Sequence, residues 1–355
     1  ADGAEAEADA GAVALTVEVL RELRQEAVVK RSLGGLRRLL LAFRDGCHVG
    51  DADGVDGGAF RRHFVIESGV AYNRLMLLCV SSLHTLLRHH LGMKPRSELA
   101  ADAAAAAAEE GSTPSTGLAV QERLPTDRPS WRKLQPPARS CAGNLVHFLA
   151  QSVEPSMTRL LLQQLEHYLV FFGAFPRLQR KLLKQLVQLW STADDEPTRL
   201  LAFLRVRQIA AELPFPAVEH CLKATYLAYV RNAKFYTEAS RPVITLMRNC
   251  VVELSRLDAA SSYQHAFVYI RQLALSLRAA LTKKDPDSVR AVYSWQFLNS
   301  VRAWVQVLSV PATQAGDAEY LEAMRPLVYP LVQIITGMIN LVPAPRHYPL
   351  RLHGC

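Results

Sequence analysis

The sequence predicts an all-α protein made of successive helices. Apolar residues recur at helical spacing along most of its 355 residues, and no convincing alternating strand pattern occurs between Val13 and Leu341. Prolines also stand near the start of predicted helices, where the missing amide hydrogen costs nothing; they are Pro155, Pro176, Pro197, Pro216, Pro242 and Pro286. A chain of this length is too long for one ordinary core, so it is either multidomain or an extended repeat.

The N-terminal third divides into three parts. Residues 1–12 are acidic and of low complexity, which predicts a disordered leader. Residues 13–95 are expected to form an N-terminal helical segment, with helical periodicity over 13–43 and a further helix over about 68–91. Residues 96–140 contain an alanine run followed by a stretch rich in Pro, Ser and Thr, and this composition predicts a low-complexity linker.

Residues 141–355 are expected to form HEAT- or armadillo-like helical repeats. The expected helices cover approximately 156–172, 176–191, 197–212, 216–233, 241–256, 261–283, 286–309 and 319–341. Helix pairs recur every ~40 residues, although irregularly, and each pair has apolar faces that only neighbouring pairs can cover. An α-solenoid with a concave binding surface is therefore the expected architecture.

Polar side chains interrupt the apolar helices between Tyr226 and Trp304. They are Arg231, Asn232, Lys234, Gln264, His265, Arg271, Gln272 and Gln296. They lie among residues expected to be buried, where polar groups need hydrogen-bond partners. We interpret them as links between helices that fix the stacking angle, in preference to the lining of a ligand pocket, because buried arginine is normally paired.

Basic residues gather in two places. Arg177, Arg180, Lys181 and Lys184 form an i, i+3, i+4, i+7 stripe on one predicted helix, and Arg132 and Lys133 lie in the segment 123–139. With a formal net charge of +8, these residues are candidates for contact with nucleic acid or with an acidic partner. A solvated helix flank explains the stripe equally well at this stage.

The sequence lacks the patterns of enzymes and metal sites. No GxSxG, phosphate-loop, GxGxxG or HExxH motif occurs, and the six cysteines form no CxxC pair. His84, His89 and His90 share a predicted helix without suitable co-ligands, so we expect surface or interface histidines. We therefore expect no catalysis, no cofactor, no metal and no small-molecule substrate. The uncharged run 326–345 is interrupted by prolines, which favours a buried helix over a membrane span.

Four blocks follow one another along the sequence: FPRLQRKLLKQLVQLWST at 175–192, YLAYVRNAKF at 226–235, YQHAFVYIRQLALSLRAALTKKDPDSVRAVYSWQFLNSVRAW at 263–304, and LVYPLVQIITGMINLVPAPRHYPLRLH at 327–353. In this order they resemble the nucleolar complex protein 2 family of ribosome-assembly factors. A weaker similarity covers parts of residues 36–80.

The resemblance implies a non-catalytic helical-repeat scaffold in the nucleus, nucleolus and nucleoplasm. Such a scaffold is expected to form a heterodimer with other nucleolar complex proteins and to associate with pre-60S ribosomal particles, with direct rRNA contact as an open question. Family members continue past the last block and carry a Lys-rich leader, so we expect this chain to be a fragment truncated at the C-terminus.

Two other hypotheses come from different classes. A karyopherin-like transport adaptor is also an irregular helical solenoid, and binding to a Ran-type GTPase or to import cargo would distinguish it. A cryptic enzyme has no motif in its favour.

Overall fold

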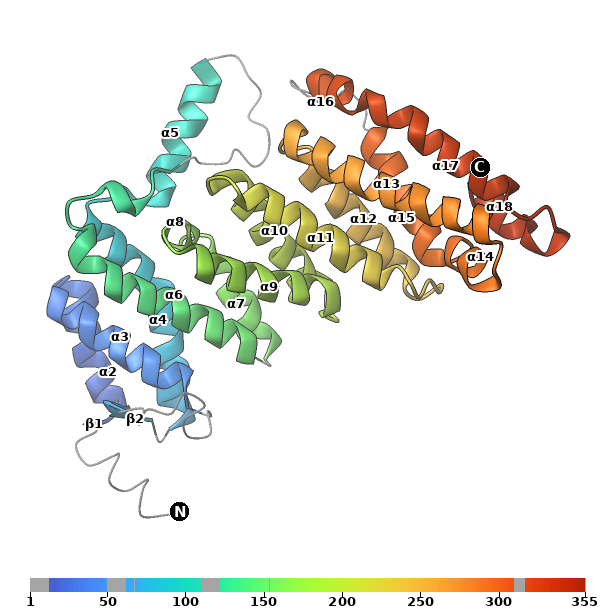
Figure 1. Ribbon diagram of the computed structural model, residues 1–355. Helices are drawn as coiled ribbons and strands as arrows, with labels where there is room; N and C mark the ends of the chain where they lie inside the picture. The colour runs from blue at the N-terminus through green and yellow to red at the C-terminus, as the bar shows by residue number, and fades with distance from the viewer. Residues whose placement is uncertain are drawn as a thin grey trace. The chain divides into compact units, whose positions relative to one another are not determined.

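The computed structural model describes residues 13–49, 62–66, 68–109, 122–152, 154–309 and 317–354 (Figure 1). Helices dominate these residues, which confirms the all-α prediction. The chain forms two compact units, residues 1–185 and residues 186–355. The expected leader, residues 1–12, lies outside the described residues, and the helical-repeat solenoid stays a prediction.

The first unit is a set of packed helices. Its elements are α2 (Val17–Arg24), η1 (Gln25–Val29), α3 (Leu33–Cys47), α4 (Gly69–Leu91), α5 (Arg96–Glu109), η2 (Pro125–Asp127), α6 (Trp131–Gln151), α7 (Pro155–Leu165), α8 (Leu169–Gly173) and the start of α9 (Pro176–Thr192). The helix α3 packs on both α4 and α6, and their apolar faces form the core of this unit.

A pair of short strands was not expected from the sequence. Strand β1 (Val13–Ala14) pairs in parallel with β2 (Phe64–Val65). Two residues are too few to show the alternating pattern by which a strand is recognised in a sequence. The buried carboxylate of Asp45 positions β2, because it accepts hydrogen bonds from the backbone amides of His63 and Phe64 at 2.7 and 2.9 Å.

The expected linker 96–140 differs from the structure at both ends. Residues 96–109 form α5, since alanine is the strongest helix former. Residues 131–140 belong to α6, where Trp131, Leu134 and Ala138 are buried. The first compact unit ends at Gln185, and the expected division of the chain at residue 140 stays a prediction.

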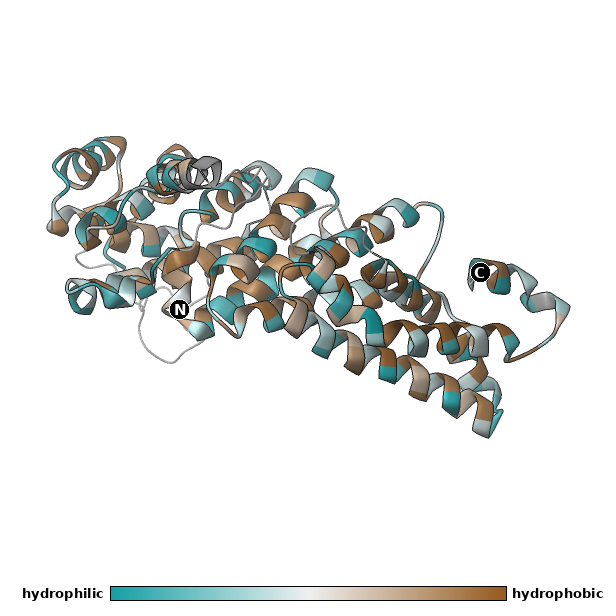
Figure 2. Cartoon of the chain, turned by 90° about the horizontal axis from the view of Figure 1, so that it is seen from above, coloured by the Kyte–Doolittle hydropathy of each residue, from teal (hydrophilic) through white to brown (hydrophobic). Residues whose placement is uncertain are grey.

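The second unit contains the remaining helices. They are the end of α9, α10 (Glu196–Glu212), α11 (Ala217–Asn232), α12 (Arg241–Ser255), α13 (Ala259–Lys283), α14 (Pro286–Val292), α15 (Trp295–Leu308), α16 (Asp317–Met324), η3 (Arg325–Leu327), α17 (Val328–Asn340), η4 (Pro345–His347) and α18 (Tyr348–Gly354). In this unit α10 packs on α11, α11 on α13, and α15 contacts α11, α12 and α13. Hydrophobic and hydrophilic residues alternate along the helices, as expected when each helix buries one side (Figure 2).

Local sequence explains where several of these helices begin. Asp195, Asp258 and Asp285 are N-caps whose carboxylates accept hydrogen bonds from the amides of Thr198, Ser261 and Ser288. Three expected helices are divided in the structure: 156–172 into α7 and α8, 286–309 into α14 and α15, and 319–341 into α16, η3 and α17.

Among the described residues, α4 is the helix long and apolar enough to cross a bilayer by length and composition. Half of its apolar window is buried inside the protein, against neighbours that include α3 and α6. This is the environment of a core helix in a helical bundle.

Candidate interaction surfaces

The predicted basic stripe lies on an exposed face of α9. The side chains of Arg177, Arg180, Lys181 and Lys184 are all exposed, whereas Leu182 and Leu186 of the same helix are buried. None of the four cations forms an ion pair with a described carboxylate; Arg180 donates only to the backbone carbonyl of Pro176 in its own helix. We call these four residues the α9 basic face.

Two further predicted cations lie in the first turn of α6. Arg132 and Lys133 are exposed, and no described carboxylate pairs with them. The first turns of α6 and α9 contain no acidic residue. Because a helix N-terminus already carries partial positive charge, Arg132, Lys133 and Arg177 add to the potential instead of offsetting it. Both helix starts therefore favour an anionic contact.

Three of the residues predicted to link helices make specific contacts. The Gln296 amide donates to the Val230 carbonyl at 3.1 Å, which joins α15 to α11. The Asn232 amide donates to Ala228 within its own helix. His265 is half-buried and stacks on Tyr269, and burial lowers its pKa.

The expectation of burial is wrong for the other five. Arg231, Lys234, Gln264, Arg271 and Gln272 are exposed. On α13 the buried face is formed by other positions, such as Tyr269, Ile270, Leu273 and Leu277. The helix α13 carries apolar residues on several sides, and Phe267, Val268 and Leu275 lie on its exposed side together with the polar residues.

The hydrogen bonds that join α11 to α15 come mainly from residues that sequence reasoning missed. The Tyr229 hydroxyl donates to the Asn299 carbonyl at 2.9 Å, and the Asn299 amide donates to the Ala233 carbonyl at 3.3 Å. The Trp304 indole donates to the Tyr226 hydroxyl at 3.0 Å. All four of these side chains are buried, so each bond satisfies a group that water does not reach.

A second set of bonds joins α15 to α12. The Arg248 guanidinium donates to the Gln306 amide oxygen at 2.7 Å, and the Gln306 amide nitrogen donates to Asn249 at 2.9 Å. Gln296, Asn299 and Gln306 are spaced i, i+3 and i+10, so they lie on one side of α15. That polar periodicity within the apolar α15 is the signal that could have identified them.

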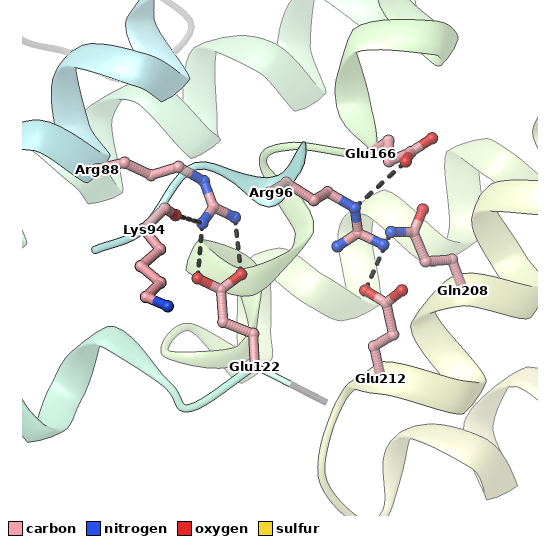
Figure 3. A network of polar contacts seen from close by, with 7 residues as sticks. All are labelled: Arg88, Lys94, Arg96, Glu122, Glu166, Gln208 and Glu212. Carbon is pink, nitrogen blue, oxygen red and sulfur yellow. Dashed lines mark hydrogen bonds and ion pairs between the residues drawn. The ribbon is translucent and has the colours of Figure 1, made fainter. Parts of the chain in front are cut away.

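In the first unit a buried ion pair joins α4 to the segment before η2. Arg88 binds Glu122 through two parallel hydrogen bonds of 2.6 and 2.7 Å and also donates to the Lys94 carbonyl (Figure 3). The Arg88 side chain is 4% exposed and that of Glu122 is 10% exposed. Arg96, at the start of α5, donates to Glu166 at 3.2 Å. In both ion pairs the arginine and the carboxylate therefore bind each other.

One histidine of α4 differs from the expectation of surface or interface positions, because His84 is buried, whereas His89 is exposed and His90 is half-buried. The ring of His84 stacks on His167 with centroids 4.5 Å apart, and burial, together with the nearby His167 and Arg88, lowers its pKa to about 4. The adjacent Tyr168 hydroxyl donates to the Val80 carbonyl and accepts from the His84 amide, so it lies within the α4 hydrogen-bond ladder.

A cavity of about 420 Å³ adjoins these side chains. Its lining includes His84, Arg88, Arg96 and His167, together with apolar residues such as Met93. Two of its cations, Arg88 and Arg96, are already paired with Glu122 and Glu166, and Arg31 also lines it.

The described residues contain no cluster of three or more side chains suited to holding a metal ion. Cys47, Cys79, Cys141, Cys221 and Cys250 are all buried. Burial raises the pKa of Cys141 to about 12 and that of Cys250 to about 11. Thiols of this kind behave as small apolar groups and are poor nucleophiles.

Comparisons with known proteins all lead to one family. The model of the Noc2p family matches residues 216–355. The chain is 35% identical over 344 residues to "Nucleolar complex protein 2" of Drosophila melanogaster, covering 96% of this chain and 41% of that protein. It is 35% identical over 321 residues to "Nucleolar complex-associated protein 2" of Arabidopsis thaliana, covering 90% of this chain and 38% of that protein.

A third relative extends the range of the similarity. The "Uncharacterized NOC2 family protein C1142.04" of Schizosaccharomyces pombe is 24% identical over 97% of this chain and 45% of its own length. The chain thus spans less than half the length of these relatives. The matches to these relatives cover both compact units. On this evidence the chain belongs to the Noc2p family.

Proposed function

We propose that the protein is a non-catalytic nucleolar factor in the assembly of the large ribosomal subunit. In this proposal it acts as a scaffold in the nucleolus and nucleoplasm, pairs with other nucleolar complex proteins, and associates with pre-60S particles during their maturation and intranuclear transport. The observation that carries the proposal is the similarity of nearly the whole chain to proteins named nucleolar complex protein 2.

The surface chemistry supports a binding role. The α9 basic face and the start of α6 present exposed cations without described ionic partners, and phosphate groups of rRNA or carboxylates of an acidic protein would complement them. Polar side chains between α11, α12 and α15 form hydrogen bonds from one helix to another, and these bonds stabilise the packing of the helices.

Affinity purification of the full-length protein from its own cells tests the proposal. We expect precursors of the large-subunit rRNA and other nucleolar complex proteins to co-purify, with no enrichment of small-subunit precursors over an untagged control. Recovery of a Ran-type GTPase or of import cargo without ribosomal precursors would instead identify a karyopherin-like adaptor.

A further inference from the structure

Helices α11 and α13 of the second unit expose a continuous row of apolar and basic side chains. Leu227 of α11 is 38% exposed, and Phe267, Val268 and Leu275 of α13 are 48%, 49% and 52% exposed. Exposed arginines alternate with these residues. We define the α11–α13 face as Leu227, Arg231, Phe267, Val268, Arg271 and Leu275.

The exposed rows of the two helices lie on the same side of the unit. Tyr226 of α11 and Tyr269 of α13 both pack on Trp304 of α15, with ring centroids 4.9 and 6.2 Å from the indole. Arg231 and Arg271 are displaced from those tyrosines by about 140° and about 200° around their helices, so both arginines point away from α15. The two helices contact each other and run side by side (Figure 1).

The charge on this face has one dominant sign. The helix α13 contains no acidic residue, whereas Arg271 and Arg278 are exposed on it. On α11 the exposed cations are Lys223 and Arg231, and the single acidic residue, Glu219, is half-buried near His265. A complementary surface would therefore carry carboxylates.

From this arrangement we propose that the α11–α13 face binds an amphipathic helix of another protein, with leucine-like side chains along its centre and Asp or Glu along its edges. Exposed aromatic and aliphatic side chains beside arginine are typical of protein interfaces. A base can stack on Phe267, but nucleic acid offers little aliphatic surface to cover Val268 and Leu275. This inference rests on the proposed function, since it assigns a surface to the pairing with a second assembly factor.

Site-specific photocrosslinking in cells tests this assignment. A photoreactive phenylalanine analogue replaces Phe267 in the full-length protein, and Leu77, a comparably exposed apolar residue of α4, receives the same analogue as a control. After irradiation, mass spectrometry identifies the crosslinked peptide. We expect position 267, and not position 77, to crosslink to an acidic amphipathic helical segment of a different polypeptide.

Charge-reversal variants provide a second test of the α11–α13 face. The double variant Arg231→Glu/Arg271→Glu is expected to lower the crosslinking yield at position 267 by about tenfold or more, because it places like charges opposite the acidic edges. Arg290→Glu, at another highly exposed arginine of the same unit, is the matched control and should leave the yield unchanged. All the substituted arginines are exposed, so thermal unfolding should match the parent protein.

Several outcomes would overturn the inference: a crosslink to RNA, to a second copy or another segment of the same chain, or to a helix without acidic residues, or no crosslink at all. The same cells report whether large-subunit precursors still co-purify with the unmodified protein. If the precursors co-purify but the expected crosslink is absent, only the assignment of the α11–α13 face is contradicted. If neither the precursors nor the crosslink are recovered, the proposed function is contradicted as well.

Discussion

At the scale of single residues, the contact between Tyr226 and Trp304 is the clearest test of how α11 and α15 are joined. Substituting Tyr226→Phe keeps the ring but leaves the buried Trp304 indole N–H without its acceptor. We expect a loss of about 1–3 kcal/mol in the free energy of unfolding, measured by urea denaturation. Tyr263→Phe is the control, because Tyr263 is only half-buried, and an equal loss in both variants would contradict this role for the hydroxyl.

His84 predicts a pH dependence of stability. Its pKa is 6.5 when unperturbed and about 4 in the folded protein, so between these values only the unfolded chain binds the proton. Stability contributed by neutral His84 is therefore fully present above pH 6.5 and is lost as the pH falls toward 4.

Urea titrations at pH 7 and pH 4.5 measure this effect. We expect His84→Phe, which keeps a buried ring against His167, to lose less stability over this interval than the parent protein. His220→Gln, at an exposed histidine, should behave as the parent does. An equal pH response in parent and His84→Phe would show that His84 does not carry the effect.

At the scale of elements, the start of α3 offers a matched pair of glycines. A Cβ atom at Gly34 would meet nothing within 4 Å, whereas one at Gly35 would lie 2.8 Å from the backbone nitrogen of Ala27. We expect Gly34→Ala to stabilise the protein by about 0.5–1 kcal/mol, since it reduces the freedom of the unfolded chain. Gly35→Ala should destabilise it, because backbone atoms would have to move. Equal midpoints in a urea titration would contradict this close approach of α3 to η1.

The α9 basic face leads to a prediction about salt. Replacing Arg177, Arg180, Lys181 and Lys184 by Gln removes at most four phosphate contacts. The binding constant K for single-stranded RNA should then depend less on salt: the negative slope of log K against log salt concentration should become smaller in magnitude by about 3. Filter binding at several salt concentrations measures the slope, with Arg290→Gln/Arg325→Gln as the control at two other exposed arginines. An unchanged slope in the fourfold variant would exclude the α9 basic face as the RNA contact.

The helices of the second unit could largely be predicted from the sequence. Proline at the first turn and aspartate N-caps mark the starts of α10 and α14, so their beginnings were placed within a residue. The interruption between α14 and α15 was not predicted, because the Ser294 N-cap lies inside a continuous apolar pattern. The helix α5 was missed because an alanine run is both low in complexity and strongly helical.

The sites were harder to predict than the elements. The α9 basic face was correctly expected to be a helical face because its cations follow a strict helical spacing opposite leucines. The links between helices were mostly misassigned, since one helix with apolar residues on several sides gives no clear phase. Arg271 and Gln272 lie about 100° and about 200° around α13 from the buried Ile270. Since α13 has apolar residues on several sides, only the packing of neighbouring helices decides which side is covered.

At the scale of the whole molecule, similarity to the relatives extends over both compact units, while the family model covers residues 216–355 of the second unit. The α9 basic face belongs to the first unit and the α11–α13 face to the second. The two proposed binding chemistries, phosphate with cations and an acidic helix with apolar and basic residues, can therefore be tested separately by surface variants in the intact protein.

The most direct test of the central claim is rapid depletion of the full-length protein in its own cells, followed by pulse-labelling of rRNA. If the protein is an assembly factor for the large ribosomal subunit, mature large-subunit rRNA should stop accumulating while its precursors persist, and synthesis of small-subunit rRNA should continue. Unchanged maturation of large-subunit rRNA after complete depletion would contradict the account.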